Sequence, residues 1–278
     1  MNFTLKILGT ASAMPISDRN PSAQVLSVRG RLFLIDCAEG TQRQFRREKL
    51  SFARVEAIMI SHIHGDHVFG IFGLLSTLAM LGRKNELRIY APSSFGPILR
   101  FFLSYYGEGL TYDIIHCPLE MKGPETIYED KYLRVSAFPL NHKIECFGFR
   151  FDEIPSPQHP DGAAAQTVSY AYCSDTAPFP ELAAWVKGVT VLYHEATYTA
   201  EYADKAAERF HSTTRDAAAC ALEAGAGTLL IGHYSSRIRD IAVFERECQE
   251  IFLNSIALND GDVCEIAHKP VVHSAGGR

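Results

Sequence analysis

The segment 61–67 reads SHIHGDH and places three imidazoles and one carboxylate within six consecutive residues. It follows 55–60, a nearly continuous apolar run that predicts a fully buried strand, and it precedes an apolar stretch that predicts a helix to about Leu81. Polar groups held between buried elements are costly to desolvate unless they bind a ligand or one another. The segment therefore predicts a metal site at a strand end, where α/β proteins commonly build their sites.

Gly65 divides this motif into two parts. His62 and His64 alternate at the strand end, whereas Asp66 and His67 follow the bend. Two adjacent clusters result, and two metal ions fit them more naturally than one. The alternative, a solvated histidine-rich loop, is disfavoured because the apolar elements on both sides leave little room for it.

Three further strands are followed by residues that bind metals in proteins. His142 follows the predicted strand 133–138, Asp175 follows 169–173, and His233 follows 228–231. Taken singly, each is better explained as a hydrogen-bonded turn residue. Taken together, they complete a candidate set of seven ligands: His62, His64, Asp66, His67, His142, Asp175 and His233.

The order of predicted elements indicates an α/β fold with two packed sheets and helices outside. Strands are predicted at 3–8, 24–28, 31–35, 55–60, 87–91, 112–117, 133–138, 147–151, 169–173, 189–193 and 228–231. Helices are predicted at 39–49, from the metal motif to 81, at 93–106 with a serine cap, and at 180–186, 199–209, 214–224 and 240–252. No linker or fixed-period repeat divides the chain, so we expect one domain over 1–278.

Composition limits the classes of partner. The 278 residues are 47% hydrophobic and 21% charged, which excludes a disordered or fibrous chain. The net charge of −5 gives no global field for nucleic acid, so any polyanion must be held by metal ions or by a local patch. Such a patch is available in Arg43, Arg46, Arg47 and Lys49, which are equally explained as a solvated helix face.

The seven cysteines are scattered and form no CxxC pair, which argues against a cysteine-ligated metal site. Unpaired cysteines are typical of a reducing compartment, and the longest apolar region, 68–81, is shorter than a membrane span. We therefore expect a cytoplasmic protein that does not bind membranes.

The metal motif resembles the HxHxDH signature of the metallo-β-lactamase superfamily, and the full set of motifs resembles the ribonuclease Z family of tRNA 3′-processing endonucleases. The motifs run in order along nearly the whole chain: LGT at 8–10, DCAEGTQ at 36–42, PLNH at 139–142, FGF at 147–149, CSDT at 173–176, HEAT at 194–197, HST at 211–213 and GHYSSR at 232–237. HxHxDH alone indicates the superfamily, whereas HEAT, HST and GHYSSR are more specific. The resemblance implies an αββα sandwich, in agreement with the predicted elements.

The resemblance also implies a division of roles among these residues. One zinc ion would be held by His62, His64 and His142, the other by Asp66, His67 and His233, with Asp175 bridging the two. Manganese or iron would suit the same oxygen and nitrogen ligands. Asp66 would also orient the attacking water, since paired metal ions activate water for phosphoryl displacement.

Other motif residues are expected to act on the substrate. His211 precedes a Thr213-x-x-Asp216 capping pattern that predicts a helix start, so it would protonate the leaving 3′-oxygen while Glu195 orients it. Ser235, Ser236 and Arg237 would bind phosphate oxygens. The remaining histidines have no predicted role in the site: His116, His159, His194, His268 and His273.

One expected feature of the family is missing. Members typically carry a long arm that grips tRNA, inserted between the motifs of His142 and Asp175. Here only 32 residues separate those positions, and 154–167 reads as a short Pro- and Ala-containing loop. The metal chemistry is unaffected, but much of the sequence-independent affinity for tRNA would be lost.

We therefore expect a zinc-dependent endoribonuclease that removes the 3′ trailer from precursor tRNA, acting as a homodimer like other family members. The alternative is a phosphodiesterase for small or cyclic substrates with the same dinuclear site, which the short loop favours. A thioester hydrolase or β-lactamase has no need of His211 and Glu195. A catalytically silent RNA-binding protein is disfavoured by the complete ligand set.

Overall fold

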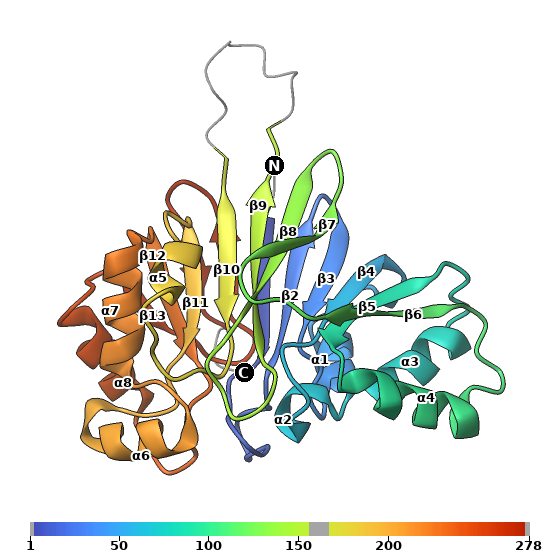
Figure 1. Cartoon of the computed structure of the whole chain (residues 1–278), viewed down its shortest axis with the longest axis horizontal. Helices are drawn as coiled ribbons and strands as arrows, with labels where there is room; N and C mark the ends of the chain where they lie inside the picture. The colour runs from blue at the N-terminus through green and yellow to red at the C-terminus, as the bar shows by residue number, and fades with distance from the viewer. Residues whose placement is uncertain (1–2, 156–166, 276–278) are drawn as a thin grey trace.

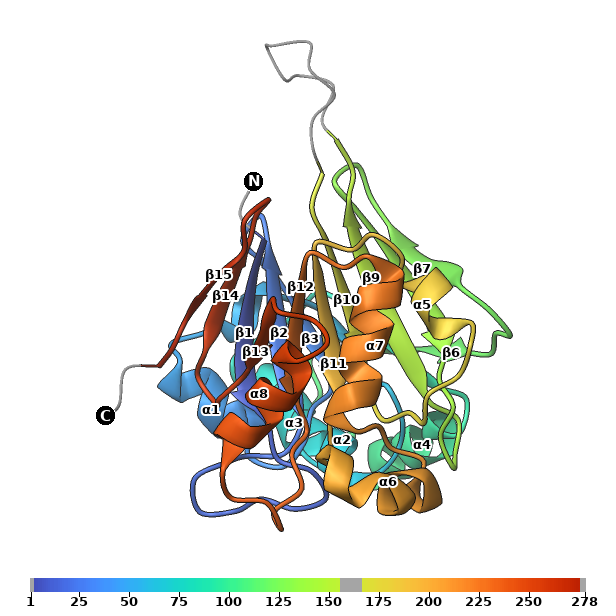
Figure 2. The same ribbon diagram turned by 90° about the vertical axis from the view of Figure 1, so that its left-hand side faces the viewer.

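The computed structural model describes residues 3–155 and 167–275 as two β-sheets packed face to face with helices on both outer surfaces (Figures 1 and 2). The first sheet has the order β15 (Val271–His273), β14 (Val263–Ile266), β1 (Phe3–Gly9), β2 (Ala23–Val28), β3 (Arg31–Ile35), β4 (Val55–Met59), β5 (Leu87–Pro92) and β6 (Ile114–Leu119). The second has the order β13 (Ser255–Ala257), β12 (Thr228–Gly232), β11 (Val191–Glu195), β10 (Ser169–Cys173), β9 (Phe147–Glu153), β8 (Leu133–Pro139) and β7 (Glu125–Glu129). The predicted αββα sandwich is confirmed.

Helices cover the outer face of each sheet. On the first sheet these are α1 (Thr41–Arg47), α2 (Gly65–Val68), α3 (Ile71–Met80) and α4 (Phe95–Tyr106), together with the short 3-10 helix η1 (Phe52–Arg54). With the second sheet lie α5 (Leu182–Trp185), η2 (Ala200–Tyr202), α6 (Ala203–Arg209), α7 (Thr214–Ala224) and α8 (Ile241–Gln249).

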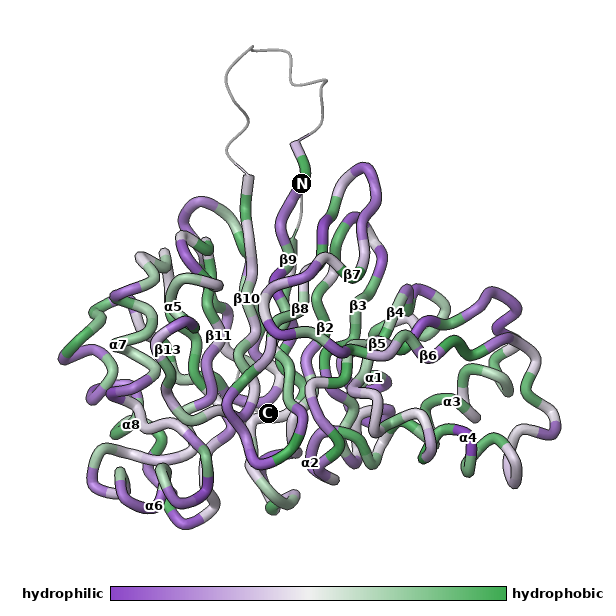
Figure 3. Tube along the Cα trace, viewed as in Figure 1, coloured by the Kyte–Doolittle hydropathy of each residue, from purple (hydrophilic) through white to green (hydrophobic). Residues whose placement is uncertain are grey.

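Apolar side chains between the sheets form the central core. Phe33, Phe149, Phe151 and Tyr170 are fully buried there, and Figure 3 shows hydrophobic residues along the strands of both sheets. Two further apolar clusters lie outside this core, one between each sheet and the helices that cover it. This layered burial holds both sheets in place, because the central strands, such as β3, β4, β10, β11 and β12, present apolar side chains to both faces.

The strand directions place one set of strand ends at a common edge. β3 to β6 are parallel to one another, as are β10 to β13, and β8 points the same way as β10 because β9 is antiparallel to both. The carboxyl ends of β4, β8, β10, β11 and β12 therefore meet at the lower edge of the sandwich in Figure 1. This is the edge at which the predicted ligands follow their strands.

Most predicted elements are confirmed to within two residues, but two predictions are wrong. The helix expected up to Leu81 is broken at Phe69–Gly70 into α2 and α3, because the Gly70 amide donates to the Cys37 carbonyl oxygen at 2.8 Å instead of to the preceding turn. Only glycine fits there, since a Cβ would lie 2.0 Å from the Ala38 carbonyl oxygen. The second wrong prediction is the serine cap of the helix expected at 93–106: α4 begins at Phe95, Ser94 makes no side-chain cap, and the Ser93 hydroxyl instead donates to Glu120.

Several short strands were not predicted, namely β7 and the C-terminal β13, β14 and β15. The loop predicted over 154–167 and His159 lie outside the described residues, apart from Ile154, Pro155 and Thr167. Across 3–155 and 167–275, none of the helices has the length and apolar character needed to cross a membrane.

Candidate metal centre

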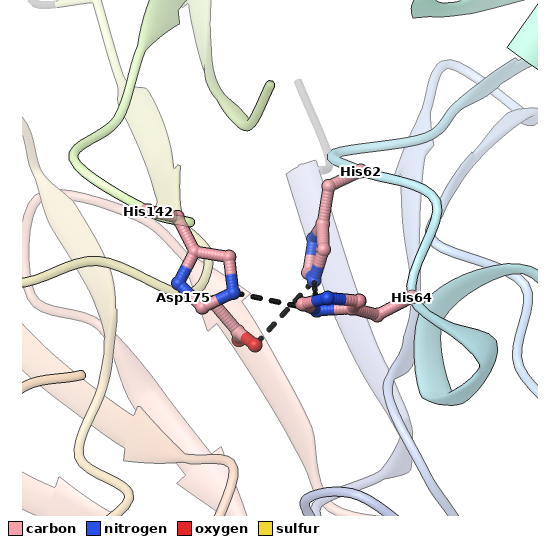
Figure 4. A group of neighbouring side chains, drawn as sticks. All are labelled: His62, His64, His142 and Asp175. Atoms are coloured by element: carbon pink, nitrogen blue, oxygen red, sulfur yellow. Dashed lines mark hydrogen bonds and ion pairs between the residues drawn. The ribbon is translucent and has the colours of Figure 1, made fainter. Parts of the chain in front are cut away.

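Seven side chains from the segments that follow four strands converge at the common edge of the sandwich and form two clusters. The first contains His62 and His64 after β4, His142 after β8 and Asp175 after β10. Figure 4 shows His62 and His64 approaching from one side of the cluster, and His142 and Asp175 approaching from the other. His64 Nδ1 lies 3.1 Å from His62 Nε2 and 3.3 Å from His142 Nε2, and His62 Nε2 lies 3.5 Å from Asp175 Oδ2.

The second cluster contains Asp66, His67 and His233. The Nε2 atoms of His67 and His233 lie 3.2 Å apart, and Asp66 Oδ2 lies 3.4 Å from His233 Nε2 and 3.7 Å from His67 Nε2. Asp175 Oδ1 is 3.4 Å from His67 Nε2 and 3.3 Å from His233 Nε2. Asp175 thus directs one oxygen to each cluster, and the structure brings together all seven residues predicted from the sequence.

The outward nitrogens of these imidazoles are held by other groups. His67 Nδ1 lies 2.7 Å from Asp36 Oδ2, His233 Nδ1 lies 2.8 Å from Thr197 Oγ1, and His142 Nδ1 lies 2.9 Å from the Phe210 carbonyl oxygen. A ring whose Nδ1–H donates in this way presents an Nε2 lone pair to the opposite side. The Nε2 lone pairs of His67, His233 and His142 therefore point into the two clusters.

A metal ion fits this donor set. Zinc bound tetrahedrally by nitrogen at about 2.0–2.1 Å places its ligand atoms about 3.3–3.4 Å apart, close to the spacings in both clusters. Two imidazole lone pairs at 3.2 Å repel each other unless a proton or a cation lies between them. Asp175 Oδ1 is buried and makes no hydrogen bond, so it too has capacity for a cation.

The electrostatics of the clusters favour a bound cation. Burial lowers the pKa of His62 to about 4 and also lowers the pKa values of His64 and His142, which keeps these rings in the neutral form that binds metals. Burial opposes protonation of His67 as well, but Asp175, Asp36 and Asp66 outweigh it and raise the pKa of His67 well above its usual value. The field that attracts a proton to His67 attracts a metal ion in the same way.

Asp36 and Thr197 support the clusters from behind, and sequence reasoning assigned neither of them a role. The buried Asp36 carboxylate accepts from the Ser61 amide at 2.8 Å, the Ser61 hydroxyl at 2.9 Å and the Tyr172 hydroxyl at 2.7 Å, in addition to His67. Its φ of 55° lies in the left-handed region, which aspartate tolerates better than most residues. Asp36 therefore links the two sheets to the second cluster.

A second buried carboxylate, Glu195, holds His211 beside the clusters. His211 Nδ1 lies 3.0 Å from Glu195 Oε1, and the Thr197 hydroxyl donates to Glu195 Oε2 at 2.8 Å. Burial lowers the pKa of His211, but Glu195 and Asp175 outweigh burial and raise it to about 9. The predicted pairing of His211 with Glu195 is thus present in the structure, and Thr197 connects it to His233.

The capping box predicted after His211 is confirmed, because the Thr213 side chain accepts from the Asp216 amide and Asp216 accepts from the Thr213 amide. His194 is buried, and its Nδ1 donates to the Glu195 carbonyl oxygen at 2.7 Å, as expected for a structural residue. Among the described residues, His116, His268 and His273 likewise belong to neither cluster.

A pocket of about 660 Å³ opens over both clusters. Ser235, Ser236 and Arg237, which are expected from the sequence to bind phosphate, line this pocket together with His211. Three basic residues that the sequence did not indicate line it as well: Lys143, Lys205 and Arg209. Two of these are on α6, which lies beside the pocket only through the packing of the second sheet's helices, so no local motif marks them.

Comparison with known proteins agrees with this architecture. Residues 31–234 match the family described as the β-lactamase superfamily domain. Ribonuclease Z of Porphyromonas gingivalis is 37% identical over 295 aligned positions, which cover 93% of this chain and 97% of that protein. This chain belongs to the ribonuclease Z family. The resemblance inferred from the sequence motifs is confirmed.

Other ribonuclease Z relatives extend the match. The protein named Ribonuclease Z in Bacteroides fragilis is 36% identical over 91% of this chain and 96% of its own. The crystal structure of the short form of human tRNase Z matches with a TM-score of 0.81 and 26% identity over 95% of this chain and 99% of that chain. The metallo-β-lactamase fold protein YhfI from Bacillus subtilis has a TM-score of 0.75 at 18% identity, which shows a common fold.

Replacement of Asp36 by asparagine is expected to destabilise the protein. Asparagine tolerates the same backbone conformation. Its side-chain NH2 group, however, would face groups that themselves donate hydrogen bonds, and the negative charge beside His67 would be lost. We expect the free energy of unfolding to fall by about 2–4 kcal/mol, measured by guanidinium denaturation in the presence of a chelator. An unchanged free energy of unfolding would contradict the proposed role of this carboxylate.

Proposed function

We propose that this chain is a metal-dependent endoribonuclease that removes the 3′ trailer from precursor tRNA. The observation that carries the proposal is that two ligand clusters joined by Asp175 lie beside the Glu195–His211 pair, with His211 and residues of both clusters lining one pocket. The names of the relatives, Ribonuclease Z and tRNase Z, support the same substrate. Nuclease chemistry needs both parts: groups that stabilise charge on phosphate and a group that protonates the leaving oxygen.

We propose two zinc ions as the resident metals, with manganese or iron as alternatives. His62, His64 and His142 would hold one ion, Asp66, His67 and His233 the other, and Asp175 would bridge them. Bound there, paired divalent cations neutralise phosphate charge and make water a better nucleophile at neutral pH.

Residues of the chain would carry the proton transfers and the positioning of the substrate. Asp66, whose Oδ2 accepts from the Ala13 amide at 2.6 Å, would orient the attacking water and accept its proton. His211, fixed through Nδ1 by Glu195, would donate a proton from Nε2 to the leaving 3′-oxygen. Ser235, Ser236 and Arg237 would bind the oxygens of the phosphate.

The second candidate is a phosphodiesterase for small or cyclic substrates. The alignment to the Porphyromonas relative spans 295 positions, more than the 278 residues of this chain, so that relative has residues that this chain lacks. Fewer residues leave less surface for a large RNA. The basic pocket wall favours the nuclease, because Lys143, Lys205 and Arg209 exceed what one small phosphodiester requires.

A cytoplasmic location and a homodimer complete the proposal. All seven cysteines lie in the described part of the chain and are free, which suits a reducing compartment. On α4, inward residues such as Phe95 and Phe102 pack on the sheet, but Phe101, Tyr105 and Tyr106 are 65–69% exposed. A helix that is apolar on its outer face as well is typical of an interface, which we assign to a second copy of this chain.

The nuclease assignment predicts cleavage of a precursor tRNA directly after the discriminator position in the presence of zinc or manganese. We expect kcat/KM for the precursor to exceed that for a chromogenic phosphodiester by at least about 100-fold, because only the RNA uses the basic wall of the pocket. An intact precursor beside a rapidly hydrolysed small phosphodiester would instead establish the second candidate.

Two variants serve as controls for the division of roles. Asp175→Ala should abolish cleavage and reduce metal content, since it removes the group shared by both clusters. His211→Ala should slow cleavage by about 10²–10⁴-fold and leave metal content unchanged. Equal loss of metal in the two variants would contradict the assignment of His211 to proton transfer.

The dimer assignment predicts that the wild-type chain has twice its monomer mass in light scattering. The double variant Phe101→Glu/Tyr105→Glu should be monomeric, because it places charges in an apolar interface. Leu253→Glu, which changes an exposed residue elsewhere, should remain dimeric. A dimer that survives the double variant would show that α4 is not the interface.

A further inference from the structure

A second pocket, of about 460 Å³, lies next to the proposed metal centre. Gly65 and Asp66, at the start of α2, line the pocket over the metal clusters, whereas Phe69 and Gly70, directly after α2, line the second pocket. Its remaining wall comes from α1 and the residues just before it, including Arg43 and Arg46, and from Gly73 on α3. The two pockets therefore lie at opposite ends of one short helix.

Phe69 presents an aromatic face to solvent in this pocket. The side chain is 68% exposed, although the neighbouring Val68 is buried. Its ring lies against the backbone of the metal loop, because a Cβ at Gly65 would be 2.3 Å from the ring carbon Cε2. The ring is thus supported on one side and open on the other, as in a platform for stacking.

Arg43 and Arg46 supply positive charge beside the ring. They lie one turn apart on α1, both are exposed, and in the part of the chain that the structure describes neither forms an ion pair. The Arg46 guanidinium is held over the ring of Phe52, 5.3 Å from its centroid. One carboxylate, Glu39, also lines the pocket, so two guanidinium groups face one acid in a chain whose net charge is −5.

We propose that this pocket binds the unpaired RNA that flanks the scissile phosphate, with a base stacked on Phe69 and phosphates bound by Arg43 and Arg46. An exposed aromatic ring beside basic side chains is the combination that binds single-stranded nucleic acid. A duplex does not fit the pocket in this way, because its bases are already stacked on one another. The inference rests on the proposed function and resolves the two explanations of the basic helix in favour of a binding patch.

The first test measures binding of a fluorescent single-stranded oligoribonucleotide to the full chain in a chelator, where no cleavage occurs. Phe69→Ala should weaken binding on the order of ten-fold. The double variant Arg43→Ala/Arg46→Ala should reduce the slope of log affinity against log salt by about 1.4, roughly 0.7 for each phosphate that is no longer neutralised.

Matched controls remove similar groups from other surfaces. Leu253→Ala removes an exposed apolar side chain, and Arg215→Ala/Arg246→Ala removes two charges from α7 and α8. Both controls should bind the oligonucleotide as the wild type does. The inference is overturned if the pocket variants bind like these controls, or if they change only the dimer dissociation constant.

The second test compares cleavage of precursors with trailers of one and ten nucleotides. The pocket variants should raise KM for a precursor at least five-fold and leave kcat/KM for a small chromogenic phosphodiester unchanged. A defect seen only with the long trailer places the trailer in the pocket, and a defect seen with both places the mature 3′ end there. Equal loss on the small phosphodiester would overturn the inference.

The two tests separate this inference from the proposed function. If the wild type cleaves neither precursor, the proposed function fails, and the oligonucleotide measurement still decides whether the pocket binds RNA. If the wild type cleaves both precursors and the pocket variants match it, only the inference fails.

Discussion

The buried carboxylate of Asp36 is the contact on which the site depends. It accepts hydrogen bonds from His67 of the second cluster, from Ser61 at the start of the metal motif and from Tyr172 of the opposite sheet. A carboxylate without solvent is tolerable only when its lone pairs are filled by donors, and here the donors come from both halves of the sandwich. The same carboxylate therefore joins the two sheets and orients His67 toward the second cluster.

The sequence predicted the ligands well because each has a local signal. His62 to His67 form a contiguous motif between buried elements, and His142, Asp175 and His233 each follow a strand whose end lies at the same edge. Once the strands are oriented, convergence follows from the geometry of the sheets. The pairing of His211 with Glu195 was predicted from the helix start that follows His211, in agreement with the family resemblance, and is matched by their 3.0 Å contact.

What the sequence did not predict depends on packing between distant segments. The role of Asp36 requires Tyr172, 136 positions away, and Lys205 and Arg209 reach the pocket only through the placement of α6. The strands β13 and β15 have three residues each, too few for an alternating pattern. The break at Gly70 likewise reflects its backbone hydrogen bond to Cys37 rather than any loss of apolar character in the segment.

Metal content and position test the central claim most directly. The account predicts two divalent ions per chain by elemental analysis, and anomalous diffraction peaks about 3.5–4 Å apart on either side of Asp175. Fewer than one ion per chain after reconstitution with zinc or manganese, or peaks away from the seven ligands, would contradict it.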